Sequence, residues 1–138
     1  MSKIIVVVVC IQIFLIVNSC FKNNYYDYRL EVINKSNKTI YAEGSASYPD
    51  TSLVYTVSPF NHKPDKAAPG GIIKIVRGGS WEEAFQENIH QKLIIFIFDA
   101  AIADTTPWDT IKKKYLILKR YDLTLHDLDS INFKVTYP

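Results

Sequence analysis

The sequence predicts a mainly β protein: a single β-sandwich, immunoglobulin-like or transthyretin-like, of about seven short strands with one or two short helices. Several segments alternate apolar and polar residues with the period of a half-buried strand. Clusters of glycine, proline, asparagine and serine separate these segments, and helical periodicity is confined to short stretches. These observations favour two packed sheets, and a barrel-like closure of the same strands is the alternative.

The first two strands are expected to form a hairpin. Residues 28–32 alternate apolar and polar side chains, and residues 39–43 return to a strand-like composition. Between them, residues 34–38 (Asn-Lys-Ser-Asn-Lys) are typical of a turn, because asparagine and serine side chains bond to nearby backbone groups. Residues 53–57 are predicted as a third strand.

A proline-rich loop comes next. Residues 58–71 form the longest irregular stretch, because their three prolines and two glycines do not suit a regular ladder. Loops of this length are usually functional or mobile. Residues 72–76 are predicted as another strand, which the glycine pair at 78–79 ends.

One longer helix is predicted after this strand. Ser80 and Glu83 have the spacing of a capping box, in which each side chain satisfies the backbone N–H of the other residue. Trp81, Phe85 and Ile89 recur every fourth residue and are expected to form one apolar stripe that faces the core.

The apolar run Leu93 to Phe98 contains no polar residue and is predicted as a central strand buried on both faces. Residues 106–109 then favour a second short helix with proline at its first position. Residues 115–119 are predicted as a strand, and Thr124 with Asp127 as a second capping box before a single turn. Alternation over residues 133–137 predicts the final strand.

The N-terminal residues have the pattern of a secretion signal. An apolar run, Ile4 to Val17, follows Lys3 and leads to a small residue before Cys20. Residues 16–20 (Ile-Val-Asn-Ser-Cys) resemble the lipobox of a bacterial lipoprotein signal peptide. The resemblance implies cleavage before Cys20 and acylation of its sulfur and its new amino group, by palmitate or a similar chain.

This interpretation divides the chain into a lipoprotein signal peptide at 1–19, a lipidated tether at 20–27 and a β-sandwich domain at 28–138. A membrane-spanning helix is the rival interpretation of the first part. A span needs about 20 apolar residues, and Gln12 interrupts this shorter run. Because Cys10 leaves with the signal and acylation uses the thiol of Cys20, we expect no disulfide and no cysteine metal site in the mature chain.

Two further segments extend the resemblance. Residues 118–128 with the closing residues 135–138, and residues 48–53, are similar to small uncharacterised outer-membrane lipoproteins of the Bacteroidales type, in which Tyr-Asp-Leu-Thr precedes Asp-Leu and a final Tyr-Pro. The resemblance implies a lipid anchor in the outer membrane and carries no known activity. Aromatic and basic residues follow Cys20 where surface-exported lipoproteins have acidic clusters, so the periplasmic face is expected rather than the cell surface.

No motif points to catalysis, to a metal or to a cofactor. His62, His90 and His126 lack the one-turn spacing of a helical metal site. The sequence contains no Gly-x-Ser-x-Gly nucleophile elbow. A formal net charge of +2 gives no reason to expect nucleic acid as a partner. We therefore expect no catalytic residue, no metal and no small-molecule cofactor.

The expected function is that of a lipid-anchored, non-catalytic binding module of the cell envelope. Its expected partners are the membrane, through the lipid on Cys20, and an envelope protein or glycan. Function concentrates on irregular loops, so the proline-rich loop is the expected binding surface. The candidate binding residues are Phe60, His62, Lys63, Lys66 and Trp108. The alternative is a small extracytoplasmic hydrolase that acts on envelope or dietary glycan and uses His62 or His126.

Overall fold

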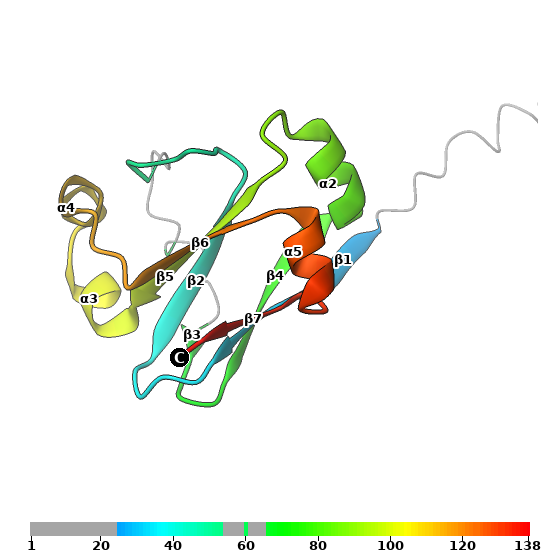
Figure 1. The fold of residues 1–138 in the computed structure, drawn as a ribbon. Helices are drawn as coiled ribbons and strands as arrows, with labels where there is room; N and C mark the ends of the chain where they lie inside the picture. Colours follow the sequence, from blue (N-terminus) through cyan, green and yellow to red (C-terminus); the bar gives the residue numbers. More distant parts are fainter. Residues whose placement is uncertain (1–24, 54–59, 61–65) are drawn as a thin grey trace, which may run out of the picture.

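The computed structural model describes residues 25–53, 60 and 66–138, and it is mainly β, with two sheets and four short helices in this part of the chain (Figure 1). One sheet has the strand order β4-β1-β7, and the other has the order β3-β2-β5-β6. The strands are β1 (Tyr26–Asn34), β2 (Ile40–Ser45), β3 (Lys66–Ala67), β4 (Ile72–Gly78), β5 (Leu93–Asp99), β6 (Lys119–Leu123) and β7 (Lys134–Tyr137). The helices are α2 (Trp81–Glu87), α3 (Ala100–Thr105), α4 (Trp108–Lys114) and α5 (Leu125–Ser130).

The expected hairpin between the first two strands is wrong. Strand β1 lies in the centre of the three-stranded sheet, antiparallel to β4 and parallel to β7, whereas β2 belongs to the other sheet. The predicted turn at 34–38 is present, but it carries the chain from one sheet to the other. Asn34 holds this crossing, because its buried side-chain amide donates to the carbonyls of Lys38 (2.7 Å) and Ala67 (2.9 Å).

Strand β5 is the central strand that the sequence predicts. It lies between β2 and β6, and every residue from Leu93 to Phe98 is buried. Successive side chains point to opposite faces of a strand, so β5 contributes to two hydrophobic clusters. The first core cluster joins both sheets with α2 and α5, and it includes Leu93, Ile95 and Ile97. The second core cluster includes Ile94, Phe96 and Phe98, together with residues of α3 and α4.

Helix α2 begins as predicted and ends early. The Ser80 hydroxyl accepts from the N–H of Glu83 (3.2 Å), and the Glu83 carboxylate accepts from the N–H of Ser80 (3.2 Å). Trp81 and Phe85 are buried, but Ile89 is 91% exposed. The prediction that Ile89 faces the core is therefore wrong. The reason is the extended backbone of Asn88, whose side chain donates to the carbonyl of Lys92 (2.7 Å) and ends the helix before Ile89.

The C-terminal part confirms one prediction and corrects another. Thr124 and Asp127 form the expected capping box at the start of α5. The predicted strand at 115–119 is wrong, because Tyr115 adopts a left-handed conformation (φ 49°) that ends α4, and strand β6 starts only at Lys119. Helix α3 is an addition to the predicted helices. It begins where the Asp99 carboxylate accepts from the N–H of Ala101 (3.0 Å).

Only part of the prediction for the middle of the chain can be compared with the structure. Leu53, expected to start the third strand, is buried but not in a strand, and residues 54–57 lie outside the described residues. Within the stretch predicted as irregular, Lys66 and Ala67 pair with β2 as the short strand β3.

Strand β1 begins at Tyr26, inside the segment predicted as a tether, and it contains an irregularity that reverses the exposure of its first residues. The pairing register with β4 shifts between Asp27 and Leu30. As a result Asp27 is fully buried, whereas Tyr28, expected to share a face with Leu30, is 55% exposed. An extra residue in one strand has this effect, because side chains on either side of a bulge no longer alternate in phase.

Candidate functional site

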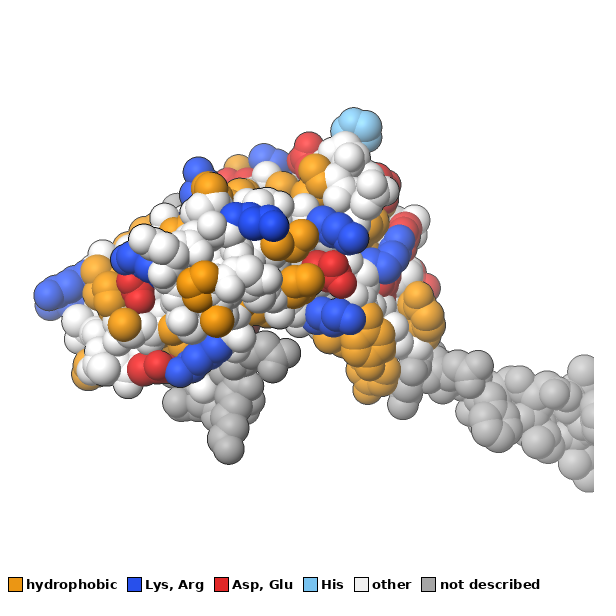
Figure 2. Space-filling model, turned by 90° about the horizontal axis from the view of Figure 1, so that it is seen from below, with side chains coloured by type: hydrophobic (Ala, Val, Ile, Leu, Met, Phe, Trp, Pro, Cys, Tyr) orange, Lys and Arg blue, Asp and Glu red, His pale blue; other side chains and the backbone are white. Residues whose placement is uncertain are grey.

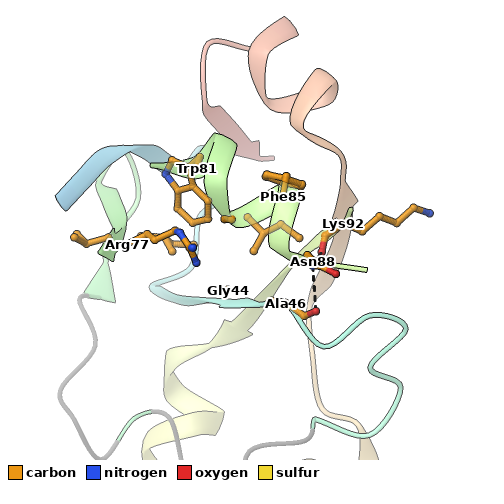
Figure 3. A pocket seen from close by; sticks show the side chains of 11 residues that line it. Gly44, Ala46, Arg77, Trp81, Phe85, Asn88 and Lys92 are labelled. Carbon is orange, nitrogen blue, oxygen red and sulfur yellow. Dashed lines mark hydrogen bonds between the residues drawn. The ribbon is translucent and has the colours of Figure 1, made fainter. Parts of the chain in front are cut away.

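A hollow of about 240 Å³ lies between α2 and the ends of β2 and β4, and we call it the α2 pocket (Figure 3). Trp81 and Phe85 border it from the helix, and Gly44 and Ala46 lie below them. Its complete lining is Gly44, Ala46, Ile75, Val76, Arg77, Trp81, Ala84, Phe85, Asn88, Lys92 and Leu93. Most of these side chains are apolar, so the pocket suits an apolar group.

Gly44 lets a side chain of β4 approach β2 closely beside the hollow. On the face of β2 that joins the first core cluster, Ile40 and Ala42 carry side chains and Gly44 does not. A Cβ atom at Gly44 would lie 3.3 Å from Cγ2 of Ile75 and 3.8 Å from Cδ1 of Leu93. Glycine therefore permits a close approach of Ile75 to β2, and a larger residue at this position would force Ile75 to move.

Trp81 forms part of the wall of the α2 pocket with its indole ring. Its side chain is only 4% exposed, and its backbone N–H donates to the buried carboxylate of Asp27 (3.2 Å). Its indole Nε1 is buried and has no hydrogen-bond partner in the described structure. A buried donor without a partner is unfavourable by about 1–3 kcal/mol.

Two basic side chains lie at the edge of the α2 pocket. The Arg77 guanidinium donates to the carbonyl of Ser80 (3.2 Å) and forms a long ion pair with Glu87 (3.4 Å). The ammonium group of Lys92 lies 4.5 Å from the ring centroid of Tyr48 and points away from the hollow (Figure 3). The ion pair between Arg77 and Glu87 is exposed to water and weak. Arg77 is therefore already paired with a carboxylate, Lys92 is directed away from the hollow, and the interior of the α2 pocket is apolar.

The structure brings two of the predicted binding residues together. The Phe60 ring lies 5.6 Å from the Trp108 ring, edge to face, and 4.7 Å from the ring of Tyr41. Both residues are partly buried against the second core cluster. They are therefore neighbours, as the sequence suggested for the loop and Trp108, but much of their surface packs against the protein itself. His62 and Lys63 lie outside the described residues.

Lys66, the fifth predicted binding residue, belongs to an ion-pair network. Its ammonium group donates to Asp104 (2.6 Å), and the hydroxyl of Tyr41 donates to the other oxygen of the same carboxylate (2.7 Å). The hydrogen bond to Asp104 raises the pKa of Lys66, and the hydrogen bond from Lys66 lowers the pKa of Asp104. Lys66 thus already neutralises a carboxylate, which reduces its value as a contact for an anionic ligand.

A second depression, of about 390 Å³, lies between α2 and α5 and contains two of the three histidines. His90 and His126 are both exposed there. Two polar neighbours in this depression are already engaged: Glu82 pairs with Arg29 (2.8 Å), and the hydroxyl of Thr124 donates to Asp127 (2.7 Å). In the part of the chain that the structure describes, no group of three or more histidine, cysteine or acidic side chains could hold a metal.

Glu43 is a residue that the sequence did not single out. It lies on β2 opposite Phe96 of β5, on the face of the second core cluster. Burial raises the pKa of its carboxyl group to about 7. Among the described residues, no hydrogen bond or ion pair of this carboxyl group is found to offset the loss of water. No local sequence pattern predicts the burial of Glu43, because this burial comes from a neighbouring strand that is distant in sequence.

No family model matches the chain, and comparisons with curated proteins and with solved structures also find no match. None of the helices among the described residues has the length and apolar character needed to cross a membrane. The resemblance to Bacteroidales-type lipoproteins therefore stays a prediction from the sequence.

The residues of the α2 pocket were not predicted as a site. Trp81 and Phe85 were expected in the core, where they do lie. Gly44 was the one available signal, since a glycine inside a strand often marks a close approach of another group. Its partners across the pocket could not be inferred, because β2 was expected to pair with β1.

Proposed function

We propose that this protein is a non-catalytic binding module of the cell envelope, anchored by lipid on Cys20 in the outer membrane with its domain on the periplasmic side. We further propose that the two sheets form a β-sandwich, since a single core cluster contains inward residues from both of them. The α2 pocket is the site that supports binding best.

The observation that carries this proposal is the α2 pocket itself, a largely apolar hollow bordered by the rings of Trp81 and Phe85 (Figure 3). Pockets for whole small molecules usually measure about 300–1,000 Å³. The α2 pocket, at about 240 Å³, is smaller and suits one apolar side chain. Interfaces between proteins depend on such anchors, in which one buried side chain contributes much of the affinity. An envelope protein is therefore the preferred partner class.

Site-specific crosslinking tests this proposal. A photoreactive residue in place of Ala46, which is exposed at the rim, should capture the partner in intact envelopes. Ala84→Met should abolish the crosslinked product, because it fills the pocket with a residue that α2 accepts readily. Ala101→Met, on the exposed side of α3, is the matched control and should leave the product unchanged. An equal yield with Ala84→Met in a folded protein would rule out the α2 pocket.

The anchor is tested separately by mass spectrometry of the protein purified from membranes. The proposal expects a chain that starts at Cys20 and carries acyl groups on this residue. Attachment should be stable, because each buried methylene contributes about 0.8 kcal/mol and more than one chain is expected. An unmodified Cys20, or a protein that retains residues 1–19, would disprove the anchor.

A glycan hydrolase is the second candidate, favoured by the depression that holds His90 and His126. A hydrolytic site there would need a further acid or nucleophile, and Thr124 and Glu82 already have partners. Turnover of peptidoglycan or glycan panels that His126→Ala abolishes, and that His90→Ala does not, would favour this candidate over the binding module.

A further inference from the structure

An exposed tyrosine cluster lies where the described chain begins. The side chains of Tyr25, Tyr26 and Tyr28 are 59%, 51% and 55% exposed, and the rings of Tyr26 and Tyr28 lie 6.3 Å apart. Val76, which is 46% exposed, lies on β4 opposite the irregular part of β1. Figure 2 shows hydrophobic side chains gathered at this end of the molecule. Exposed apolar groups that gather in this way mark an interaction surface.

The fold holds the tyrosine cluster in place. The bulge in β1 turns Tyr28 outward, and the N–H of Gly79 donates to the carbonyl of Tyr25 (2.7 Å). The Tyr26 ring covers Gly78, since a Cβ atom there would lie 3.9 Å from Cε1 of the ring. The tyrosines are therefore exposed on ordered backbone, so little conformational entropy is lost when they bind.

The position of the lipid identifies what the tyrosines contact. Tyr25 follows Cys20 by only five residues, and five residues span at most about 18 Å even when fully extended. The lipid therefore keeps the cluster close to the membrane surface. Tyrosine is enriched at the membrane–water interface, because its ring is apolar and its hydroxyl stays hydrated. Tethering also gives the cluster an effective concentration in the millimolar range, so a weak affinity is sufficient.

The charges beside the tyrosine cluster also favour contact with a membrane surface. Glu31 of β1 is paired across the sheet with Lys74 of β4 and Lys134 of β7. These side chains point away from the core, because the neighbouring Leu30 and Val32 are fully buried. Two lysines and one glutamate give this face an excess of positive charge, which attracts anionic head groups.

We infer that Tyr25, Tyr26 and Tyr28 rest in the head-group region of the bilayer that holds acylated Cys20, so that the start of β1 faces the membrane. This inference rests on the proposed lipid anchor. It adds an orientation: the domain lies against the bilayer and does not extend away from it on its tether.

Fluorescence quenching on reconstituted protein tests the inference. The full gene is expressed with Lys74→Cys, and the purified protein is placed in vesicles of phosphatidylethanolamine with a minority of phosphatidylglycerol. The new thiol is the single labelling site in an acylated chain, because Cys10 is removed and Cys20 is modified. A dye on this thiol should be strongly quenched by lipids that carry a nitroxide on the head group. A dye on Asp109→Cys, in α4, should be quenched much less.

The decisive variant replaces the three tyrosines with threonine, which keeps the strand propensity. Most of the quenching at position 74 should be lost, while the unfolding midpoint shows that the domain is folded. The matched control removes two other exposed apolar side chains, Ile102→Thr and Ile131→Thr, and should leave the quenching unchanged.

Three results would overturn the inference. Unchanged quenching in the tyrosine variant would show that the cluster does not contact lipid. A chemical crosslinker can also be used to detect contact between two copies of the chain. If the tyrosine variant lost this crosslinked product but kept its quenching, the cluster would be assigned to a second copy of the protein. A mass spectrum without acyl groups would remove the anchor and, with it, this inference, whereas an acylated chain with unchanged quenching would leave the anchor intact.

Discussion

Glu43 is partly buried by the fold and has no compensating partner among the described residues. Burial raises the pKa of its carboxyl group from 4.5 to about 7. Between these two values the unfolded chain loses its proton first, so the native state binds more protons than the unfolded state. The free energy of unfolding should therefore fall as pH rises from about 4.5 to about 7, and this loss should be complete above that range.

Glu43→Gln should remove this pH-dependent fall in the free energy of unfolding. We expect the variant to be more stable than the wild type by about 1–3 kcal/mol at pH 8, and similar to it at pH 4, because the amide stays neutral. Denaturant unfolding at the two pH values measures the difference. Glu87→Gln, at an exposed side chain, is the control and should change stability by less than about 0.5 kcal/mol. A pH-independent effect of Glu43→Gln would contradict the prediction.

Asp27 is the opposite kind of buried carboxylate. It accepts hydrogen bonds from the Arg29 side chain (2.6 Å) and from the backbone N–H groups of Arg29 and Trp81. The side-chain hydrogen bond from Arg29, with smaller help from the backbone, lowers the pKa of Asp27. Its contribution to stability is present above the ordinary aspartate pKa and is lost as pH falls through the lowered value.

Asp27→Asn should therefore destabilise the domain by about 1–3 kcal/mol at pH 7, since an amide cannot accept all of these hydrogen bonds. The cost should shrink in acid, because the wild type then loses the same interactions. Thermal unfolding between pH 7 and pH 2.5 measures both effects. Asp109→Asn, at a 92% exposed side chain, provides the comparison. A cost that stays constant down to pH 2.5 would mean that the Asp27 charge is unimportant.

At the scale of single residues, the sequence predicted correctly the features that depend on residues close together in the chain. The two capping boxes, at Ser80 and at Thr124, are confirmed because both partners lie within three residues of each other. Asp27 and Glu43 were missed because their burial depends on strands and a helix that are distant in sequence. Trp81 was placed in the core correctly, but its unpartnered Nε1 depends on packing that no sequence pattern describes.

At the scale of elements, β5 carries both core clusters, which gives a direct prediction. Ile95 belongs to the first core cluster and Phe96 to the second, and both are fully buried. Phe96→Ala should cost about 3–5 kcal/mol and Ile95→Ala about 2–5 kcal/mol, since each leaves a cavity as well as losing apolar contact.

Denaturant titration of both variants measures these costs. Ile89→Ala, at a residue that is 91% exposed, should change stability by less than about 0.5 kcal/mol. If either buried residue behaved like Ile89, β5 would not be the shared central strand.

The elements that failed were those in which tertiary pairing overrides a local pattern. The turn at 34–38 was predicted correctly, but a turn does not specify whether its flanking strands pair with each other. The strand expected at 115–119 starts late because Tyr115 takes a left-handed conformation, which a tyrosine rarely does. Ile89 matched the helical period, but Asn88 ends the helix first.

At the scale of the whole molecule, the predicted class is correct in its coarse form. The chain is mainly β, with two sheets around a shared core cluster. The distribution of strands between the sheets could not be predicted, because the parallel pair of β1 and β7 joins the two ends of the domain. The α2 pocket depends on this distribution, since β2 and β4 come from different sheets.

The two core clusters share β5, so they should unfold together although they lie on opposite faces of one sheet. Each cluster has its own tryptophan, Trp81 in the first and Trp108 beside the second. Trp108→Phe leaves a fluorescence reporter of the first cluster, and Trp81→Phe leaves a reporter of the second. In each variant, the unfolding midpoint from fluorescence should equal the midpoint from far-ultraviolet circular dichroism, as expected for a cooperative domain of this size.

The comparison is made within each variant, so a change of stability caused by the substitution itself does not affect it. Coincident midpoints in both variants would mean that loss of either cluster removes the support for β5 and therefore for the other cluster. A Trp108 signal that changes at lower denaturant than the circular dichroism would show that α3 and α4 separate first. In that case the second core cluster would be an independent layer, and Phe96→Ala should then lower the midpoint of the Trp108 transition more than that of the Trp81 transition.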